Sequence, residues 1–247
     1  MKNNNLKKEL SIEELLKETY IVFKQNFKNI LLALIIYFPI FLLLVTAVFF
    51  RIIISESILD YLIISLLIIA MSIISIFIYS YIFLIAKNHY GFKKENLKNI
   101  LKTIFFKIPK IMYTVIIMIL LIIIPFVISI LLAIINKWFL ILIIPSSFLL
   151  IKNMYYWIFS IHIPLFSGES GLNALRISKN LVKKKWWNTF FKIFILSVIS
   201  SLSSMILTGL PLSNIYLIPF IILSLILSGY CILGQAILFL NYVNIKK

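Results

Sequence analysis

Six long apolar runs divide this chain and constrain its fold more than any other feature of the sequence. A helix needs about 20 apolar residues to cross the hydrocarbon core of a bilayer. The runs reach that length and predict an all-α integral membrane protein, a six-transmembrane-helix bundle in a single domain, residues 1–247. The class of soluble domains is excluded, because 62% of the residues are hydrophobic and only 13% are charged. The expected spans are Asn29–Phe50, Leu59–Ala86, Ile111–Ile135, Trp138–Pro164, Trp187–Leu207 and Asn214–Tyr242.

Positive charge is unevenly distributed between these spans. Of the 24 Lys and Arg residues, 6 lie in residues 1–28, 7 in 87–110, 6 in 167–192 and 2 at the C-terminus. The segments expected on the opposite side hold only Arg51 and Lys137. Cytoplasmic loops carry an excess of Lys and Arg, so both termini and the two long loops are expected in the cytoplasm. Abundant Lys, Ile and Asn are typical of an AT-rich bacterial genome, and we therefore expect the bacterial inner membrane.

Three cationic segments with helical periodicity precede the first, third and fifth spans. In Ser11–Lys28, Glu95–Ile108 and Leu172–Lys192, apolar residues recur on one side of a helical wheel and charged residues on the other. Ser11 and Glu14 form a capping-box signature at the start of the first segment. We expect three amphipathic helices at the cytoplasmic surface of the membrane.

The three segments also align as parts of an internal repeat. Superposing Leu15–Lys17, Ile100–Lys102 and Ala174–Arg176 gives offsets of 85 and 74 residues. Each unit then consists of an interfacial helix followed by a transmembrane hairpin. The candidate units are residues 11–86, 95–164 and 170–243.

Small residues within the spans predict close contacts between helices, since packing in lipid depends on them. The second span contains Ser65, Ser72 and Ser75, and the sixth contains Gly229 and Gly234. A serine-lined pore is the functional alternative to helix packing.

The third cationic segment holds the first candidate binding surface. Its predicted polar stripe consists of Arg176, Asn180, Lys183 and Lys184, and its apolar side of Leu172, Leu175, Val182 and Trp186. Anionic lipids of the cytoplasmic leaflet attract each nearby cation by about 1 kcal/mol, and tryptophan favours the headgroup region. Nucleic acid is not an expected partner, because the two tryptophans lead directly into a span. We expect membrane lipids to contact Arg176, Lys179, Lys183, Lys184, Lys185, Trp186 and Trp187.

Polar residues of the fourth span form a second candidate site. Lys152 and Asn153 lie near the middle of this span, and His162 lies near its end. A lysine at the bilayer centre costs about 2.5–3.5 kcal/mol, so Lys152 should face the bundle or a watery cavity, or snorkel to the interface. It would then either bind an anionic headgroup or substrate, or belong to an aromatic belt. His162 is either a proton relay or an interfacial residue.

The segment from Tyr155 to Leu196 reads YYWIFSIHIPLFSGESGLNALRISKNLVKKKWWNTFFKIFIL. It resembles the bacterial family named for the membrane domain of glycerophosphoryl diester phosphodiesterases, with its stand-alone YciC-like relatives. The resembling elements are IPLF, the turn with Gly168 and Gly171, the Ala-Leu-basic-x-Ser pattern ending at Ser178, and KWWNTF. The resemblance implies a polytopic membrane fold. It implies no catalysis, because in fused relatives the phosphodiester chemistry belongs to a separate soluble domain.

Catalytic motifs and metal-spaced clusters of Cys, His, Asp and Glu are missing from the sequence, and no metal or other cofactor is expected. We expect a non-enzymatic membrane protein that supports the envelope or serves as a membrane partner subunit. One alternative is a permease, an export-system component or a self-resistance (immunity) protein, with a cavity lined by Lys152, Asn153 and serines. The other is a membrane-embedded lipid enzyme, which requires Lys152, Asn153 and His162 to converge.

Overall fold

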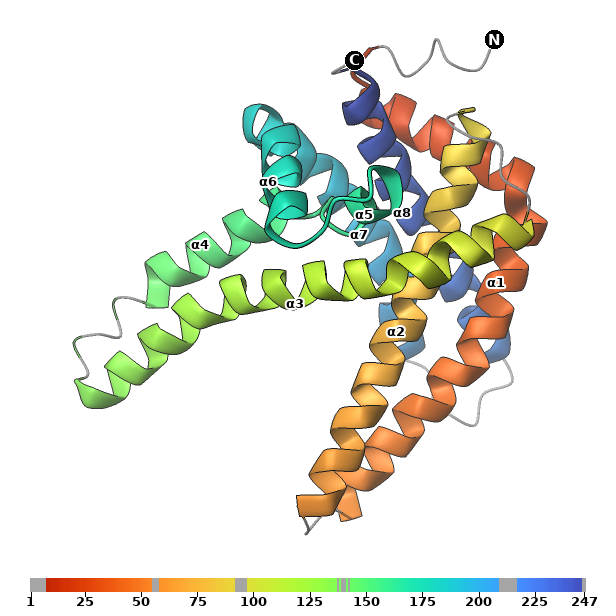
Figure 1. The fold of residues 1–247 in the computed structure, drawn as a ribbon. Coiled ribbons are helices and arrows are strands. Elements are labelled where there is room, and N and C mark those ends of the chain that lie inside the picture. The colour runs from red at the N-terminus through yellow and green to blue at the C-terminus, as the bar shows by residue number, and fades with distance from the viewer. Residues whose placement is uncertain are drawn as a thin grey trace. The chain divides into compact units, whose positions relative to one another are not determined.

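The computed structural model of this chain describes residues 8–54, 58–91, 97–136, 138, 141, 143–208 and 217–245. Within these residues the regular structure is entirely helical, which confirms the all-α class (Figure 1). The elements are α1 (Ile12–Ile54), α2 (Ile58–His89), α3 (Leu97–Ile135), α4 (Ile143–Tyr156), α5 (His162–Phe166), α6 (Gly171–Val182), the 3₁₀ helix η2 (Lys183–Lys185), α7 (Trp186–Thr208) and α8 (Leu217–Ile245).

Four helices of the described chain contain stretches that are long and apolar enough to cross a membrane. They overlap the first, second, third and sixth expected spans, and by length and composition they are those of a membrane protein. The stretches are Ile12–Ile40 in α1, Asp60–His89 in α2, Lys98–Leu132 in α3 and Ile222–Ile245 in α8.

The other two expected spans differ from a single long helix or lie partly outside the described residues. In the fourth, α4 ends at Tyr156, and turns lead from it to α5. The expected span Trp138–Pro164 is therefore interrupted between Tyr156 and His162 in the structure. α4 has 14 residues and is about 21 Å long, shorter than a hydrocarbon core of about 30 Å. The fifth expected span coincides with α7, whose side chains are described only as far as Ser201. The total of six spans therefore stays a prediction.

Helix α1 begins at the predicted capping box. The N–H of Glu14 donates to Oγ of Ser11 over 3.1 Å, and the N–H of Ser11 donates to Oε2 of Glu14 over 2.7 Å. These two bonds satisfy backbone donors that a helix start leaves without intrahelical partners. The sequence therefore predicted this helix start correctly.

The first two expected interfacial helices are not separate elements. Segment Ser11–Lys28 continues into the rest of α1, and the described part of Glu95–Ile108 continues into the rest of α3. Pro109 lies at the expected boundary in α3, and the helix runs through it. A break between an interfacial helix and a span would leave backbone N–H and C=O groups without partners at the membrane surface. A continuous helix keeps most of these groups paired. Among the three segments, only the third forms a helix of its own, α6.

The chain forms two compact units, one of Met1–Phe105 with Ile193–Lys247 and the other of Phe106–Lys192. In the first unit α1 packs against α2 and α8 (Figure 1). A Cβ atom added to Gly229 would lie 2.7 Å from Cδ1 of Leu34, and one added to Gly234 would lie 2.8 Å from Cδ2 of Leu196. The two glycines thus allow close approach of α8 to its neighbours, as predicted.

The serines of α2 behave differently from these glycines. Ser65 and Ser72 are exposed, and their hydroxyls donate to carbonyls of their own helix. No bond of these two hydroxyls to another described helix of the first unit is seen, and their role in helix contacts stays a prediction. Ser75 lies 3.2 Å from the hydroxyl of Tyr37 on α1, which agrees with the prediction. The periodicity of a uniformly apolar helix cannot tell which of its faces meets a neighbour, because the lipid-facing side is equally apolar.

Asn241 ties the two ends of the described chain together in the first unit. Its Oδ1 accepts the N–H of Leu10 over 3.4 Å, and its Nδ2 donates to the carbonyl of Lys8 over 2.8 Å. Asn241 is fully buried on α8. The segment that enters α1 and the last turns of α8 therefore lie at the same end of this unit.

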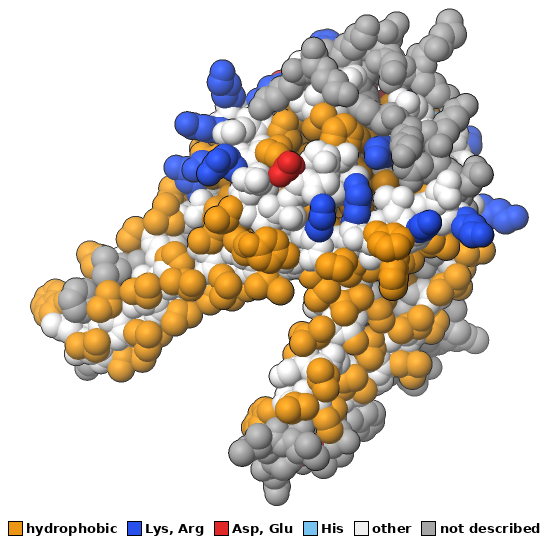
Figure 2. Space-filling model, viewed as in Figure 1, with side chains coloured by type: hydrophobic (Ala, Val, Ile, Leu, Met, Phe, Trp, Pro, Cys, Tyr) orange, Lys and Arg blue, Asp and Glu red, His pale blue; other side chains and the backbone are white. Residues whose placement is uncertain are grey.

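On the face that Figure 2 shows, apolar side chains cover much of the surface of the described residues. On α3, for example, Ile134 and Ile135 are 76% and 78% exposed. Contiguous apolar surfaces of this kind are unfavourable in water, whereas the hydrocarbon of a bilayer solvates them. The exposed surface therefore agrees with the four candidate membrane-spanning stretches.

Candidate functional site

Helix α6 and η2 carry the expected headgroup-binding cations on one side. Arg176, Lys179, Lys183 and Lys184 are exposed, and Lys185 is partly exposed. The opposite side of α6 is buried and consists of Ala174, Leu175, Ser178, Leu181 and Val182.

The apolar side of α6 is rotated relative to the predicted one. Leu172 is 59% exposed, so its predicted place on the apolar side was wrong. Leu172 precedes Arg176 by four residues and Lys179 by seven, which places it on the charged face of the helix. The buried face is instead centred on the row of Ala174 and Ser178.

Ser178 fixes α6 to the end of α4. Its hydroxyl donates to the carbonyl of Tyr156 over 2.7 Å and accepts the N–H of Phe159 over 3.2 Å, and the side chain is fully buried. The last carbonyls of a helix lack intrahelical partners, and this serine supplies one to α4. The same contact explains why α4 stops at Tyr156, since the turn that follows is held from α6. Pro164 then falls in the first turn of α5, where its missing N–H costs no intrahelical bond.

Two lysines of α3 hold the last turn of α5 and the segment that follows it. Nζ of Lys107 donates to the carbonyl of Leu165 over 2.8 Å, and Nζ of Lys110 donates to the carbonyl of Gly168 over 3.1 Å. A cation near the end of a helix stabilises its last carbonyls, and Lys107 has this role for α5. Lys110 instead holds the turn that follows α5. In the charge pattern of the sequence, the two lysines are expected only as cytoplasmic charges. Their spacing of three residues, on one face of a helix, was the signal available in the sequence.

Gly171 starts α6 in a tightly enclosed position. Oγ1 of Thr114 accepts its N–H over 2.8 Å, and its φ angle is +59°. A Cβ atom at this position would lie 2.4 Å from Cε1 of Tyr113. Both the backbone conformation and the available space therefore require glycine. Gly168 has a φ of +84°, but no heavy atom lies within 4 Å of its Cβ position.

Aromatic rings follow η2 at the start of α7. The ring of Trp186 stacks on that of Phe190 at 5.6 Å between centroids and meets the ring of Tyr155 on α4 at 5.9 Å. Trp187 is 67% exposed and stacks on Phe191 at 6.2 Å. Trp186 is therefore anchored against α4, while Trp187 presents its ring at the surface next to the lysines of η2.

Lys152 of α4 shares an aromatic partner with α6. Its Nζ lies 5.9 Å from the ring centroid of Tyr156, and Nζ of Lys179 lies 5.8 Å from the same centroid. These distances are within the range of cation–π contacts. Lys152 and its neighbour Asn153 are partly exposed. The structure thus brings Lys152, a polar residue of the second candidate site, to the charged surface of α6.

His162 lies in the interior of the second unit and outside the four candidate membrane-spanning stretches. Its ring centroid is 6.1 Å from that of Phe159, in an edge-to-face arrangement. Burial lowers the pKa of His162 to about 3, so the imidazole is neutral at pH 7. His162 is fully buried whereas Lys152 is partly exposed, so the two side chains lie in different environments. The role of His162 as a proton relay stays a prediction.

Lys192 is a buried cation that the sequence pattern did not predict. It lies on α7 with only 1% of its surface exposed. The sequence placed it among the cations of the third cytoplasmic segment, because a lysine beside two tryptophans is typical of a membrane boundary. Its position three residues after Thr189, which is also buried, shows that it belongs to the inner face of α7.

Comparisons with known proteins find no family model, no curated protein and no solved structure that matches this chain. The resemblance of residues 155–196 to the phosphodiesterase-associated membrane family therefore stays a prediction. Among the described residues, no group of three or more His, Cys, Asp or Glu side chains is placed to hold a metal ion.

Proposed function

We propose that this protein is a non-enzymatic, multi-pass protein of the bacterial inner membrane that binds the headgroups of anionic lipids. The binding surface, here called the α6–η2 surface, consists of Arg176, Lys179, Lys183, Lys184, Lys185, Trp186 and Trp187. One observation carries the proposal: the exposed cations of α6 and η2 lead directly to the exposed ring of Trp187, while the opposite side of α6 is buried. In this role the protein supports the envelope or serves as a membrane partner subunit.

The chemistry of the α6–η2 surface suits a lipid interface. Each Lys or Arg near an anionic leaflet contributes about 1 kcal/mol of attraction, and an amphipathic tryptophan ring favours the headgroup region. Lys152 adds a further cation, because it shares the ring of Tyr156 with Lys179. A surface with several cations and one exposed indole therefore favours a phosphate-rich, partly apolar partner.

The arrangement of the chain ends supports a cytoplasmic location of both termini. The contacts of Asn241 with Lys8 and Leu10 keep the two ends of the first unit together. Four or six spans would both return the chain to its starting side. The Lys-rich N-terminal segment then favours the cytoplasm for both ends, by the positive-inside rule.

We further propose that the chain is of the phosphodiesterase-associated membrane type. The residues that carry the resemblance have defined structural roles in one unit: Gly171 makes room for Tyr113, and Ser178 holds the turn after α4. A packing role for these positions supports a shared membrane fold and adds nothing in favour of phosphodiester chemistry.

The permease and lipid-enzyme alternatives draw less support from the described residues. Both depend on polar groups that converge in one cavity. Lys152 instead lies over Tyr156 on the side of α4 that Lys179 also reaches, while His162 is buried on α5. These positions favour a headgroup surface over a shared polar cavity.

The test uses the full chain in nanodiscs that contain equal amounts of phosphatidylglycerol and phosphatidylcholine with the same acyl chains. The variant Lys183→Gln/Lys184→Gln/Lys185→Gln removes three cations of the surface. Each lysine is expected to contribute up to about fivefold in preference for the anionic lipid, so the triple variant should lose most of that preference. The matched control, Lys8→Gln/Lys17→Gln/Lys24→Gln, removes the same charge from exposed positions of the first unit.

Topology is measured in the same variants by labelling of a cysteine introduced with Glu169→Cys, after Cys231→Ala has removed the native thiol. Glu169 is exposed just before α6 and should be labelled from the cytoplasmic side. The proposal is wrong if the α6–η2 triple variant keeps both the lipid preference and the labelling pattern of the unmodified chain.

A further inference from the structure

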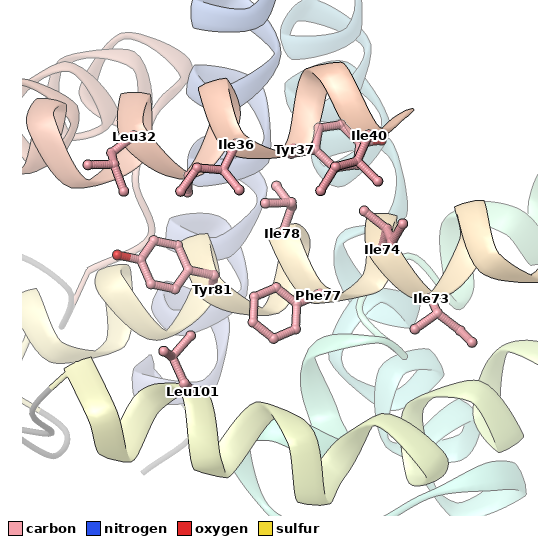
Figure 3. A pocket seen from close by; sticks show the side chains of 11 residues that line it. Leu32, Ile36, Tyr37, Ile40, Ile73, Ile74, Phe77, Ile78, Tyr81 and Leu101 are labelled. Carbon is pink, nitrogen blue, oxygen red and sulfur yellow. The ribbon is translucent and has the colours of Figure 1, made fainter. Parts of the chain in front are cut away.

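An apolar groove lies in the first unit, between α1, α2 and the start of α3 (Figure 3). Its volume is about 470 Å³, within the range of about 300–1,000 Å³ that is usual for small-molecule sites. The side chains that define its length and ends are Leu32 and Ile40 of α1, Ile73, Phe77 and Tyr81 of α2, and Leu101 of α3.

The groove is placed and sized for the interior of one bilayer leaflet. All three helices that line it are candidate membrane-spanning helices. From Leu32 to Ile40, the groove follows α1 for about 12 Å, against about 15 Å for half of a hydrocarbon core. An apolar groove of this length can accept a lipid chain, and it offers water no polar partners along most of its length.

Two cations of the described chain lie next to one end of the groove. Lys28 precedes Leu32 by four residues and Lys98 precedes Leu101 by three, so each lysine lies one turn beyond a lining residue on the same face of its helix. Both lysines are exposed. The hydroxyl of Tyr81 points toward this same end, as Figure 3 shows. The other end, at Ile40 and Ile73, is apolar.

We propose that this groove binds one acyl chain of an anionic glycerophospholipid, whose phosphate lies at Lys28 and Lys98. We infer this occupant because the groove is apolar along its length and cationic at one end, and an anionic lipid has a complementary apolar chain and a negatively charged phosphate. A second copy of the chain or a helix of another protein would fill the apolar part without any need for the two lysines. The inference depends on the proposed membrane location but on no residue of the α6–η2 surface.

Two variants separate the acyl-chain and phosphate parts of this site. Ala33→Trp places a large ring in the groove, because Ala33 is one of its lining residues. Displacing two or more methylenes from the groove is expected to weaken lipid retention about tenfold or more. Ala70→Trp is the matched control, since Ala70 is a partly exposed alanine of α2 outside the groove lining. Lys28→Gln/Lys98→Gln removes the cations, and Lys8→Gln/Lys17→Gln is its control.

The experiment is native mass spectrometry of the full chain in detergent with added phosphatidylglycerol or phosphatidylcholine of equal chain length. We expect one retained phosphatidylglycerol, its loss in Ala33→Trp but not in Ala70→Trp, and a preference over phosphatidylcholine that falls about fivefold per lysine in Lys28→Gln/Lys98→Gln. The α6–η2 triple variant should keep this one lipid, so failure of the headgroup proposal and failure of the groove proposal give different results.

Other outcomes overturn the proposal. Equal retention in Ala33→Trp and Ala70→Trp would show that the lipid lies elsewhere. A dimer in the lipid-free unmodified chain that Ala33→Trp dissociates would assign the groove to a second copy. If Ala33→Trp does not fold, phosphatidylglycerols of increasing chain length are added to the unmodified chain. Retention should then rise with chain length, and a retention that is independent of chain length refutes an acyl-chain site.

Discussion

Replacement of Ser178 by alanine removes the side chain that joins α6 to the end of α4. In the native protein its hydroxyl bonds the carbonyl of Tyr156 and the N–H of Phe159, and the serine is fully buried. Leaving a buried backbone group without its partner costs about 1–3 kcal/mol, so loss of both bonds should destabilise the unit by about 2–4 kcal/mol. At about 2–4 °C per kcal/mol for a chain of this size, the midpoint of thermal unfolding should fall by roughly 5–15 °C.

Intrinsic tryptophan fluorescence during unfolding in mixed micelles is a suitable assay, because it reports on the affected unit alone. All four tryptophans of the chain lie within Phe106–Lys192. Ser167→Ala is the matched control, since Ser167 is exposed and its hydroxyl donates only to the nearby carbonyl of Ile163. The control should change the free energy of unfolding by less than about 0.5 kcal/mol. Equal destabilisation by the two variants would refute the claim that Ser178 holds the turn.

Two further predictions use the same unfolding assay. Gly171→Ala should destabilise the second unit by about 2–4 kcal/mol, because the new Cβ atom would combine a positive φ with overlap of Tyr113. Gly168→Ala should cost only the backbone strain of about 1–2 kcal/mol, since no atom lies near its Cβ position. Equal losses of unfolding free energy in the two variants would show that Tyr113 moves aside freely. Burial depresses the folded-state pKa of His162 to about 3, below its unfolded value of about 6.5, so its contribution to stability is complete above pH 6.5 and is lost as the pH falls toward 3. Between pH 6.5 and 3, the free energy of unfolding of the unmodified chain should fall by up to about 1.4 kcal/mol per pH unit more than that of His162→Gln. If the free energies of the two chains change in parallel with pH, His162 is not buried in its neutral form.

The groove and the α6–η2 surface differ in how they relate to the sequence. The cations and tryptophans of the α6–η2 surface are adjacent in the chain, and helical periodicity predicted most of their exposed positions. The groove draws on side chains from three helices, between Leu32 and Leu101, and its lining residues look like any others in a long apolar run. Its existence depends on how α1, α2 and α3 pack, which no local pattern specifies.

Local chemistry determined the helical class, the apolar stretches and the capping box at Ser11, because each depends on residues within a turn or two of one another. Tertiary contacts decided the rest. Ser178 ends α4 from 22 residues away, and Lys107 and Lys110 bond to carbonyls 58 residues further along the chain. The burial of His162 and Lys192 likewise depends on which helices surround them. A sequence pattern gives the periodicity of a helix, but in a chain that is apolar on nearly every face, only packing decides which side is protein and which is lipid.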